Sequence, residues 1–101
     1  MTNREKCIQQ WEWIAAKEGR TKKDWADKFP DLADEAGMDL CFACVEDGLF
    51  KGDCGGCPVQ WDAYGSICSY ISNPYYIWSR NKTKTNAKRV LQAIKNTWKD
   101  C

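Results

Sequence analysis

Residues 41–68 read CFACVEDGLFKGDCGGCPVQWDAYGSIC and hold five of the seven cysteines in the chain. A C-x-x-C turn brings two sulfur atoms to one point, and two such turns supply the four thiolates of a tetrahedral zinc site. Soft thiolates also select Zn²⁺ over Mg²⁺ or Ca²⁺. We therefore predict that a structural Zn²⁺ organises the fold, held by two C-x-x-C pairs, Cys41, Cys44, Cys54 and Cys57.

The ligand set has alternatives within the same stretch. Cys68 follows the second pair and could replace Cys54 or Cys57 as the fourth ligand. An iron–sulfur cluster is another metal that cysteines hold, and a C-x-x-C pair can also serve redox chemistry, although no βαβ pattern surrounds either pair. Because the chain has no histidine, it lacks the commonest general base. With a surplus of cysteines the coordination shell is expected to be closed, which favours a structural zinc ion over a catalytic one.

Size and cysteine usage fit one metal-stabilised domain spanning residues 1–101. A chain of 101 residues is small enough that its core alone gives little surplus stability. Zinc binding can contribute roughly 10–16 kcal/mol to folding, so the metal-free form is expected to be partly or wholly unfolded. We find neither a signal peptide nor an apolar run of membrane-spanning length. The expectation is a soluble cytoplasmic protein with no membrane partner, whose reduced thiols bind metal rather than form disulfides.

Helix signals flank the cysteine-rich stretch. Thr2-x-x-Glu5 is a capping box that opens a helix expected to end near Gly19. A short helix is predicted from Thr21, which Pro30 should end, and Pro30 can itself open a brief turn through Ala36. The apolar spacing of residues 61–71 predicts a further helix, which Asn73-Pro74 should break. A last amphipathic helix should begin near Thr83 or Thr85, with a core stripe at Ala87, Val90, Leu91, Ile94 and Trp98.

Between the two C-x-x-C pairs, Asp47-Gly48 and Lys51-Gly52 are turn dipeptides that favour a short hairpin tip. The predicted fold class is thus a small α-rich single domain with minor β structure. Its N- and C-terminal amphipathic helices would pack around a central, zinc-ribbon-like Cys₄ knuckle. Cys7 falls on the apolar stripe of the first helix, where a core role competes with a metal or redox role.

Charge is unevenly distributed along the chain, although the formal net charge is only +1. Residues 24–79 contain ten acidic and two basic residues, whereas residues 80–99 contain seven basic residues and no acidic one. Such asymmetry indicates a partner rather than a fold. An acidic body argues against general duplex binding and for one localised basic patch.

The basic segment follows a cluster of aromatic residues. Bases stack on aromatic rings while cations contact phosphates, so this mixture is typical of surfaces that bind single strands or nucleotides. The competing interpretation is that the aromatic residues pack in the core and the basic residues form a solvated helix face. The candidate partner-binding residues are Tyr75, Tyr76, Trp78, Arg80, Lys82, Lys84, Lys88 and Arg89.

The cysteine pairs, Cys57-Pro58-Val59-x-Trp61 and Pro74-Tyr-Tyr-Ile-Trp78 together resemble a known group of proteins. They are similar to small cysteine-rich zinc-binding proteins of phages and prophages of Gram-positive bacteria, which also share the Trp-rich first helix (Trp11-Glu12-Trp13-Ile14). The resemblance covers most of the chain. It implies a structural zinc site and a small accessory protein acting in the cytoplasm of an infected bacterium.

Two functions follow as expectations. The first is a non-enzymatic phage protein that binds and inhibits a host protein, such as part of a defence system. The association of small phage proteins with host inhibition rests on their origin rather than on residue chemistry. The alternative is a zinc module that binds nucleic acid or a nucleotide, as a regulator or a sequestering protein. Neither expectation fixes the oligomeric state.

Overall fold

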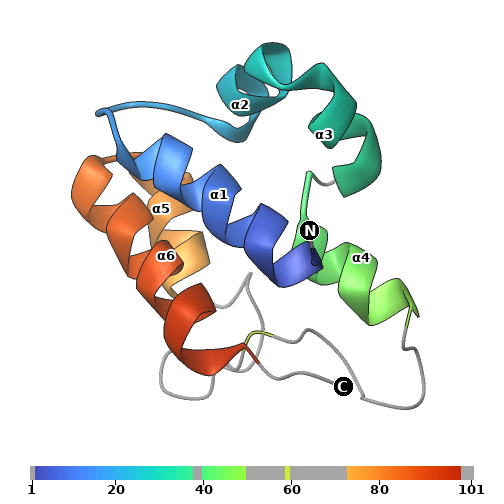
Figure 1. Cartoon of the computed structure of the whole chain (residues 1–101). Helices are drawn as coiled ribbons and strands as arrows, with labels where there is room; N and C mark the ends of the chain where they lie inside the picture. The colour runs from blue at the N-terminus through green and yellow to red at the C-terminus, as the bar shows by residue number, and fades with distance from the viewer. Residues whose placement is uncertain (1, 38–39, 50–58, 60–72, 99–101) are drawn as a thin grey trace.

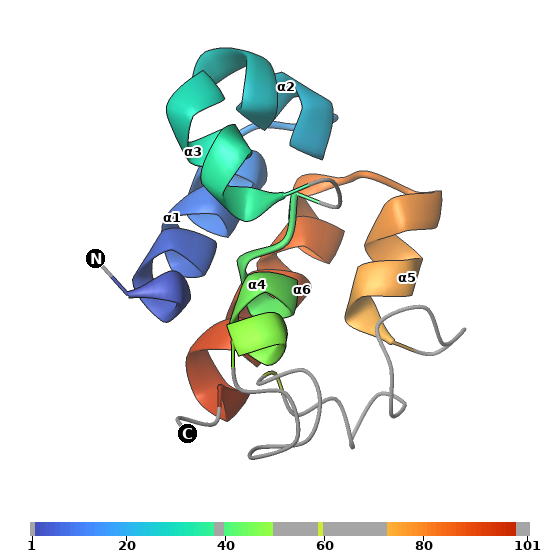
Figure 2. The same cartoon turned by 90° about the vertical axis from the view of Figure 1, so that its right-hand side faces the viewer.

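Helix α1 (Asn3–Ala15) is the helix on which the others pack, and it contacts α2, α4 and α6 (Figure 1). The computed structural model describes residues 2–37, 40–49, 59 and 73–98. Five other helices lie within these ranges: α2 (Lys22–Lys28), α3 (Pro30–Ala36), α4 (Phe42–Leu49), α5 (Pro74–Arg80) and α6 (Lys84–Thr97). Figures 1 and 2 show α2 and α3 at the top and α6 below them, on a different side of α1. The described part of the chain is a small all-α domain.

The predicted capping box opens α1. The Thr2 hydroxyl accepts a hydrogen bond from the Glu5 backbone N–H at 3.1 Å, and the Glu5 carboxylate accepts one from the Thr2 N–H at 3.2 Å. The helix ends at Ala15, earlier than expected. Gly19 takes a φ of +76°, which a glycine adopts without steric cost, and its N–H donates to the Lys82 carbonyl at 3.1 Å. This residue therefore joins two loops instead of ending the helix.

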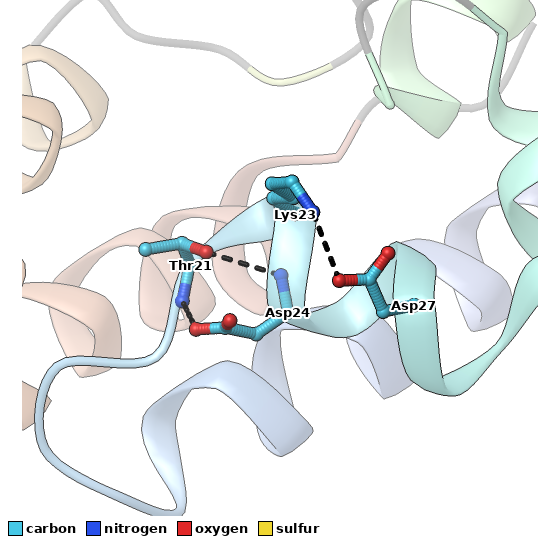
Figure 3. Close-up of polar contacts among 4 residues, drawn as sticks. All are labelled: Thr21, Lys23, Asp24 and Asp27. Carbon is cyan, nitrogen blue, oxygen red and sulfur yellow. Dashed lines mark hydrogen bonds and ion pairs between the residues drawn. The ribbon is translucent and has the colours of Figure 1, made fainter.

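The short helices α2 and α3 begin where the sequence predicts. Thr21 caps α2 in a second reciprocal box with Asp24, and Lys23 pairs with Asp27 one turn apart at 3.0 Å (Figure 3). Pro30 occupies the first turn of α3, and Gly37 follows its end with a φ of +80°. The two helices together form a tight corner over one side of α1.

The core lies where the apolar stripes of α1 and α6 face each other. Trp11 and Ile14 of α1 and Val90 and Ile94 of α6 are all buried. The Trp11 ring meets the Trp78 ring of α5 edge to face, with centroids 4.7 Å apart, a favoured arrangement for aromatic pairs. The α6 stripe thus agrees with the sequence pattern, except that Leu91 and Trp98 are only partly buried.

One local prediction is wrong. Residues 42–49 form α4 rather than the start of a hairpin tip, because Phe42, Val45 and Leu49 recur at helical spacing and Phe42 is buried against Trp25, with ring centroids 5.8 Å apart. Minor β structure is limited, within the described residues, to one isolated bridge between Val59 and Trp98.

Pro74 begins helix α5. Asn73 caps this helix by accepting a hydrogen bond from the Tyr75 N–H at 2.8 Å, and proline is favoured in the first turn, where its missing N–H costs nothing. The helix predicted over residues 61–71 lies outside the described residues. Across the part of the chain that the structure describes, no helix is long and apolar enough to cross a bilayer.

Replacing Trp11 tests the packing of α1 on α5 and α6. We expect Trp11→Ala to lower the free energy of unfolding by about 3–5 kcal/mol, because it removes a buried aromatic side chain and leaves a cavity. Urea denaturation of the purified protein measures the change. The exposed residue Lys17 supplies the control, since Lys17→Ala should stay within about 0.5 kcal/mol of wild type. A loss below about 1 kcal/mol for Trp11→Ala would contradict this account of the core.

Candidate metal centre and charged surfaces

The first C-x-x-C pair lies at the N-terminus of α4. Cys41 immediately precedes the helix, and its carbonyl accepts the Val45 N–H at 3.1 Å. Its sulfur accepts a hydrogen bond from the Cys44 N–H at 3.3 Å, in the manner of a serine or aspartate N-cap. Cys41 is half-buried and Cys44 is exposed. The pair therefore starts a helix, and the hydrogen bond turns the Cys41 sulfur toward the first turn of α4.

Hydrogen bonds from α1 and α3 hold the backbone at Leu40 and Cys41 in place. Its N–H donates to the Ala36 carbonyl at 3.1 Å, and the Leu40 N–H donates to the Gly37 carbonyl at 3.0 Å. Leu40 has a φ of +51°, a left-handed conformation that costs a non-glycine residue about 1–2 kcal/mol. The Leu40 carbonyl in turn accepts the side-chain N–H of Gln10, buried in α1, at 3.0 Å. The core thus fixes the backbone that leads into the cysteine pair.

The surroundings of Cys41 favour its thiolate. Contact with the Cys44 side chain is the largest influence and lowers the pKa, burial raises it, and the positive charge of Lys22 lowers it. Together they bring the pKa of the Cys41 thiol to about 6. The thiolate is the form that binds a metal or acts as a nucleophile. One thiolate and a neighbouring thiol are therefore ready ligands for a soft cation at neutral pH.

The remaining predicted ligands, Cys54 and Cys57, and their alternate, Cys68, lie outside the described residues. Among the residues that the structure does describe, no group of three or more potential metal ligands comes together. The donor set of the first pair fits Zn²⁺, and the full set stays a prediction. Cys7 is buried in the core on α1, which agrees with its expected role as a core residue.

The aromatic residues of α5 are largely occupied within the fold. Trp78 is only 3% exposed, in agreement with the core-packing alternative. The half-buried Tyr75 ring meets Trp11 edge to face at 6.0 Å, and Lys22 lies over it at 4.5 Å. Tyr76, also half-buried, has the Arg80 guanidinium 6.0 Å from its ring centre. These rings do not form an open stacking platform on α5.

The basic candidates differ in how much the fold engages them. The Lys82 ammonium donates to the Ser79 carbonyl at 2.9 Å and lies 5.4 Å from the Trp78 ring. Lys84 is half-buried, and its backbone N–H donates to the Glu18 carboxylate. Lys88 and Arg89 are exposed, and no hydrogen bond or ion pair joins either side chain to the described residues. The accessible charge therefore gathers on the outer face of α6.

Sequence reasoning missed two features of these sites. The charge of Lys22 lowers the pKa of Cys41 although 18 residues separate them in the sequence. No local sequence pattern predicts such an interaction. Thr85, Gln92 and Asn96 share the outer face of α6 with Lys88 and Arg89. The helical spacing that located the buried stripe of α6 could have located this opposite face as well.

Comparisons with protein-family models, with curated proteins and with solved structures find no match to this chain.

The pKa of Cys41 gives a measurable pH profile. In a short pulse directly after chelation, before helical circular dichroism is lost, alkylation of Cys41 by iodoacetamide should rise with a midpoint near pH 6, well below the value of about 8.5 for a free thiol. Lys22→Met should raise the midpoint, because it removes a positive charge that favours the thiolate, whereas Lys28→Met should leave it unchanged. Quantifying the modified peptide by mass spectrometry follows the reaction.

The same shift has a consequence for stability. A thiol whose pKa is lowered by folding stabilises the folded form fully above its unfolded pKa, and this contribution is lost as the pH falls through about 6. A reactivity midpoint above pH 8 would show that Cys44 and Lys22 do not lower the pKa of Cys41 in this way.

Proposed function

We propose that this chain is a non-enzymatic binding module, stabilised by a structural zinc ion, that acts on a macromolecule of the host cell. The observation that carries the metal part is Cys41-x-x-Cys44 at the start of α4, with the Cys41 thiol favoured as thiolate. The resemblance to small phage proteins supplies the setting, an infected bacterium. The charged surfaces of the folded helices supply the candidate binding faces.

In this proposal the zinc ion joins the cysteine-rich stretch to the helical core. Cys41 and Cys44 provide two ligands from α4, and Cys54 and Cys57 provide the other two. Because thiolates bind only when deprotonated, zinc binding releases protons and weakens in acid. The cysteine pair is tied to α1 and α3 by the hydrogen bonds described above, which involve Leu40, Gln10 and Ala36.

Elemental analysis of protein purified without added metal tests the zinc site. We expect about one zinc ion per chain, lost on chelation together with helical circular dichroism, and lost more readily at low pH. Cys41→Ser should remove most of the metal, because the remaining thiolates lose a ligand. Cys7→Ala and Cys101→Ser serve as matched controls that keep it. Cys68→Ser decides the fourth ligand, since lost zinc would place Cys68 in the shell. Far less than one equivalent of zinc, with no iron, would overturn the proposal.

An acidic surface on α2 and α3 is the candidate site for a host protein. The exposed carboxylates of these two helices are Asp24, Asp27, Asp31, Asp34 and Glu35. Three of them have partners within the described residues: Asp24 caps α2, Asp27 pairs with Lys23, and Glu35 pairs with Lys6 at 2.8 Å. Asp31 and Asp34 have no such partner there, so they are available to a basic site on an inhibited protein.

Capture experiments with paired variants test the acidic surface. The metal-loaded protein, immobilised on resin, should retain a specific protein from host lysate. The double variant Asp31→Asn/Asp34→Asn should lose that protein, because it removes two accessible charges. The control variant is Lys88→Gln/Arg89→Gln, which removes two positive charges on a different side of α1. It should still retain the captured protein. Equal retention by wild type and the acidic-surface variant would contradict this role for α2 and α3.

A second candidate function is nucleic-acid or nucleotide binding through α6. It is favoured by the exposed and unengaged side chains of Lys88 and Arg89 and by the absence of acidic residues between positions 73 and 98. The occupied rings of Tyr75 and Trp78 move the expected contacts away from α5 and onto α6.

A further inference from the structure

The outer face of α6 has a regular arrangement. Helical residues are spaced about 100° apart, which places Thr85, Arg89, Gln92 and Asn96 within an arc of about 60°. Their side chains are exposed, as are those of Lys88 and Lys95 beside them. The opposite side of the helix holds the buried residues, Ala87, Val90, Ala93 and Ile94. One face of α6 is therefore fixed to the core, and the other is entirely polar and open.

The chemistry of this face suits base edges and phosphates. Protein–protein interfaces are centred on buried aromatic and aliphatic anchors, and this arc carries none. Interfaces with DNA are more polar and more positively charged. Arginine pairs with guanine, and asparagine or glutamine pairs with adenine, in the major groove. Arg89, Gln92 and Asn96 are residues of these types, placed on one line along one helix.

Two amide side chains of this face are hydrogen-bonded to each other. The Asn96 Nδ2 donates a hydrogen bond to the Gln92 Oε1 at 3.1 Å. The pair leaves the Gln92 amino group as a donor and the Asn96 carbonyl oxygen as an acceptor. Adenine presents the complementary pattern in the major groove, an N7 acceptor beside an N6 donor. Holding two rotatable side chains in one arrangement before binding reduces the entropy lost on contact.

Helix α6 is also held rigidly and has the right size. Thr83 caps its N-terminus by accepting the Asn86 N–H at 3.1 Å, and the Glu18 carboxylate accepts the Lys84 N–H at 2.6 Å. Arg4 of α1 donates to the Lys95 carbonyl at 3.1 Å near the other end. Fourteen residues span about 21 Å, with a diameter of about 10–12 Å including side chains. The major groove, about 12 Å wide, admits such a helix.

Among the residues that the structure describes, the acidic side chains near α6 leave its outer face clear. Glu18 is used at the helix N-terminus, and Glu12 lies 3.9 Å from the Lys95 ammonium. Both belong to the flank that faces α1. Helices α2 and α3, whose carboxylates are exposed, lie on another side of α1 (Figures 1 and 2). A duplex lying along α6 would therefore contact Lys88 and Arg89. The acidic helices α2 and α3 would lie on the side away from its phosphates.

We propose that α6 is a recognition helix that enters the major groove of duplex DNA, with Arg89, Gln92 and Asn96 contacting base edges and Lys88 contacting a phosphate. The inference rests on the nucleic-acid-binding candidate and deepens it, because it names the form of nucleic acid and the residues that read it. The acidic surface of α2 and α3 stays free in such a complex.

The test begins with selection from a random-sequence duplex DNA library by the full-length, metal-loaded protein. Fluorescence anisotropy then measures binding to the selected duplex, to single-base variants of it, and to its separated strands. We expect a preferred sequence containing a guanine and an adenine. Changing one preferred base should weaken binding roughly 5- to 150-fold. The separated strands and an RNA duplex of the same sequence should bind far less tightly than the DNA duplex.

Variants of exposed residues assign the contacts without disturbing the core. Arg89→Ala should weaken binding to the selected duplex roughly 5- to 150-fold and abolish the preference at the guanine. Lys88→Gln should weaken binding to all duplexes alike and lower the slope of log affinity against log salt by about one. Lys28→Gln, which removes the same charge from α2, is the matched control and should change neither quantity. Circular dichroism and zinc content confirm that each variant is folded.

Four outcomes would overturn the proposal. Equal affinity for single strands or RNA would show that α6 does not read the major groove, although the nucleic-acid candidate would stand. Duplex binding with no preferred sequence, or a preference that Arg89→Ala leaves intact, would remove the base-reading role in the same way. Failure to bind any nucleic acid would overturn both this proposal and the nucleic-acid candidate, and would leave the protein-binding candidate.

Discussion

The burial of α1 on more than one side is the constraint on which the described structure depends. Cys7, Gln10, Trp11, Ile14 and Ala15 are all buried, and their helical positions span an arc of about 140°. An arc this wide needs several neighbours, and α2, α4 and α6 supply them. One of the five is polar, and it satisfies part of its hydrogen-bonding capacity on the Leu40 carbonyl. The packing of α1 thereby reaches the backbone beside the first cysteine pair.

Much of the helical framework could be predicted because its signals are local. Thr2, Thr21 and Thr83 cap helices, and Pro30 starts one, since each residue satisfies or spares backbone groups within a few positions. The α6 stripe is equally local. Local signals failed where two of them competed. At residues 42–49 the turn dipeptide Asp47-Gly48 favoured a hairpin, but the helical spacing of apolar residues and the burial of Phe42 outweighed it.

The candidate site could be predicted only in part, because some of its contacts join segments that are distant in the sequence. The spacing of Cys41 and Cys44 indicated a metal pair, and the structure adds that a helix starts between them. That Lys22 acts on Cys41, and that Trp78 and Tyr75 pack on Trp11, are contacts between distant segments. Sequence periodicity reports which side of an element is apolar, but it does not report which other element covers that side. Tertiary contacts of this kind needed the structure.

The pairing of α1 with α6 has a further consequence, for how the chain folds. These two helices lie at opposite ends of the sequence, so their contact closes a loop of nearly the whole chain. Contacts of such long separation slow folding, because the entropy of loop closure is lost before the contact is gained. The backbone hydrogen bond from Gly19 to Lys82 is part of the same closure. Helices α1 to α4 are contiguous in sequence and can associate early. The α5–α6 hairpin can form separately, and its docking onto α1 would then be the late, rate-limiting event.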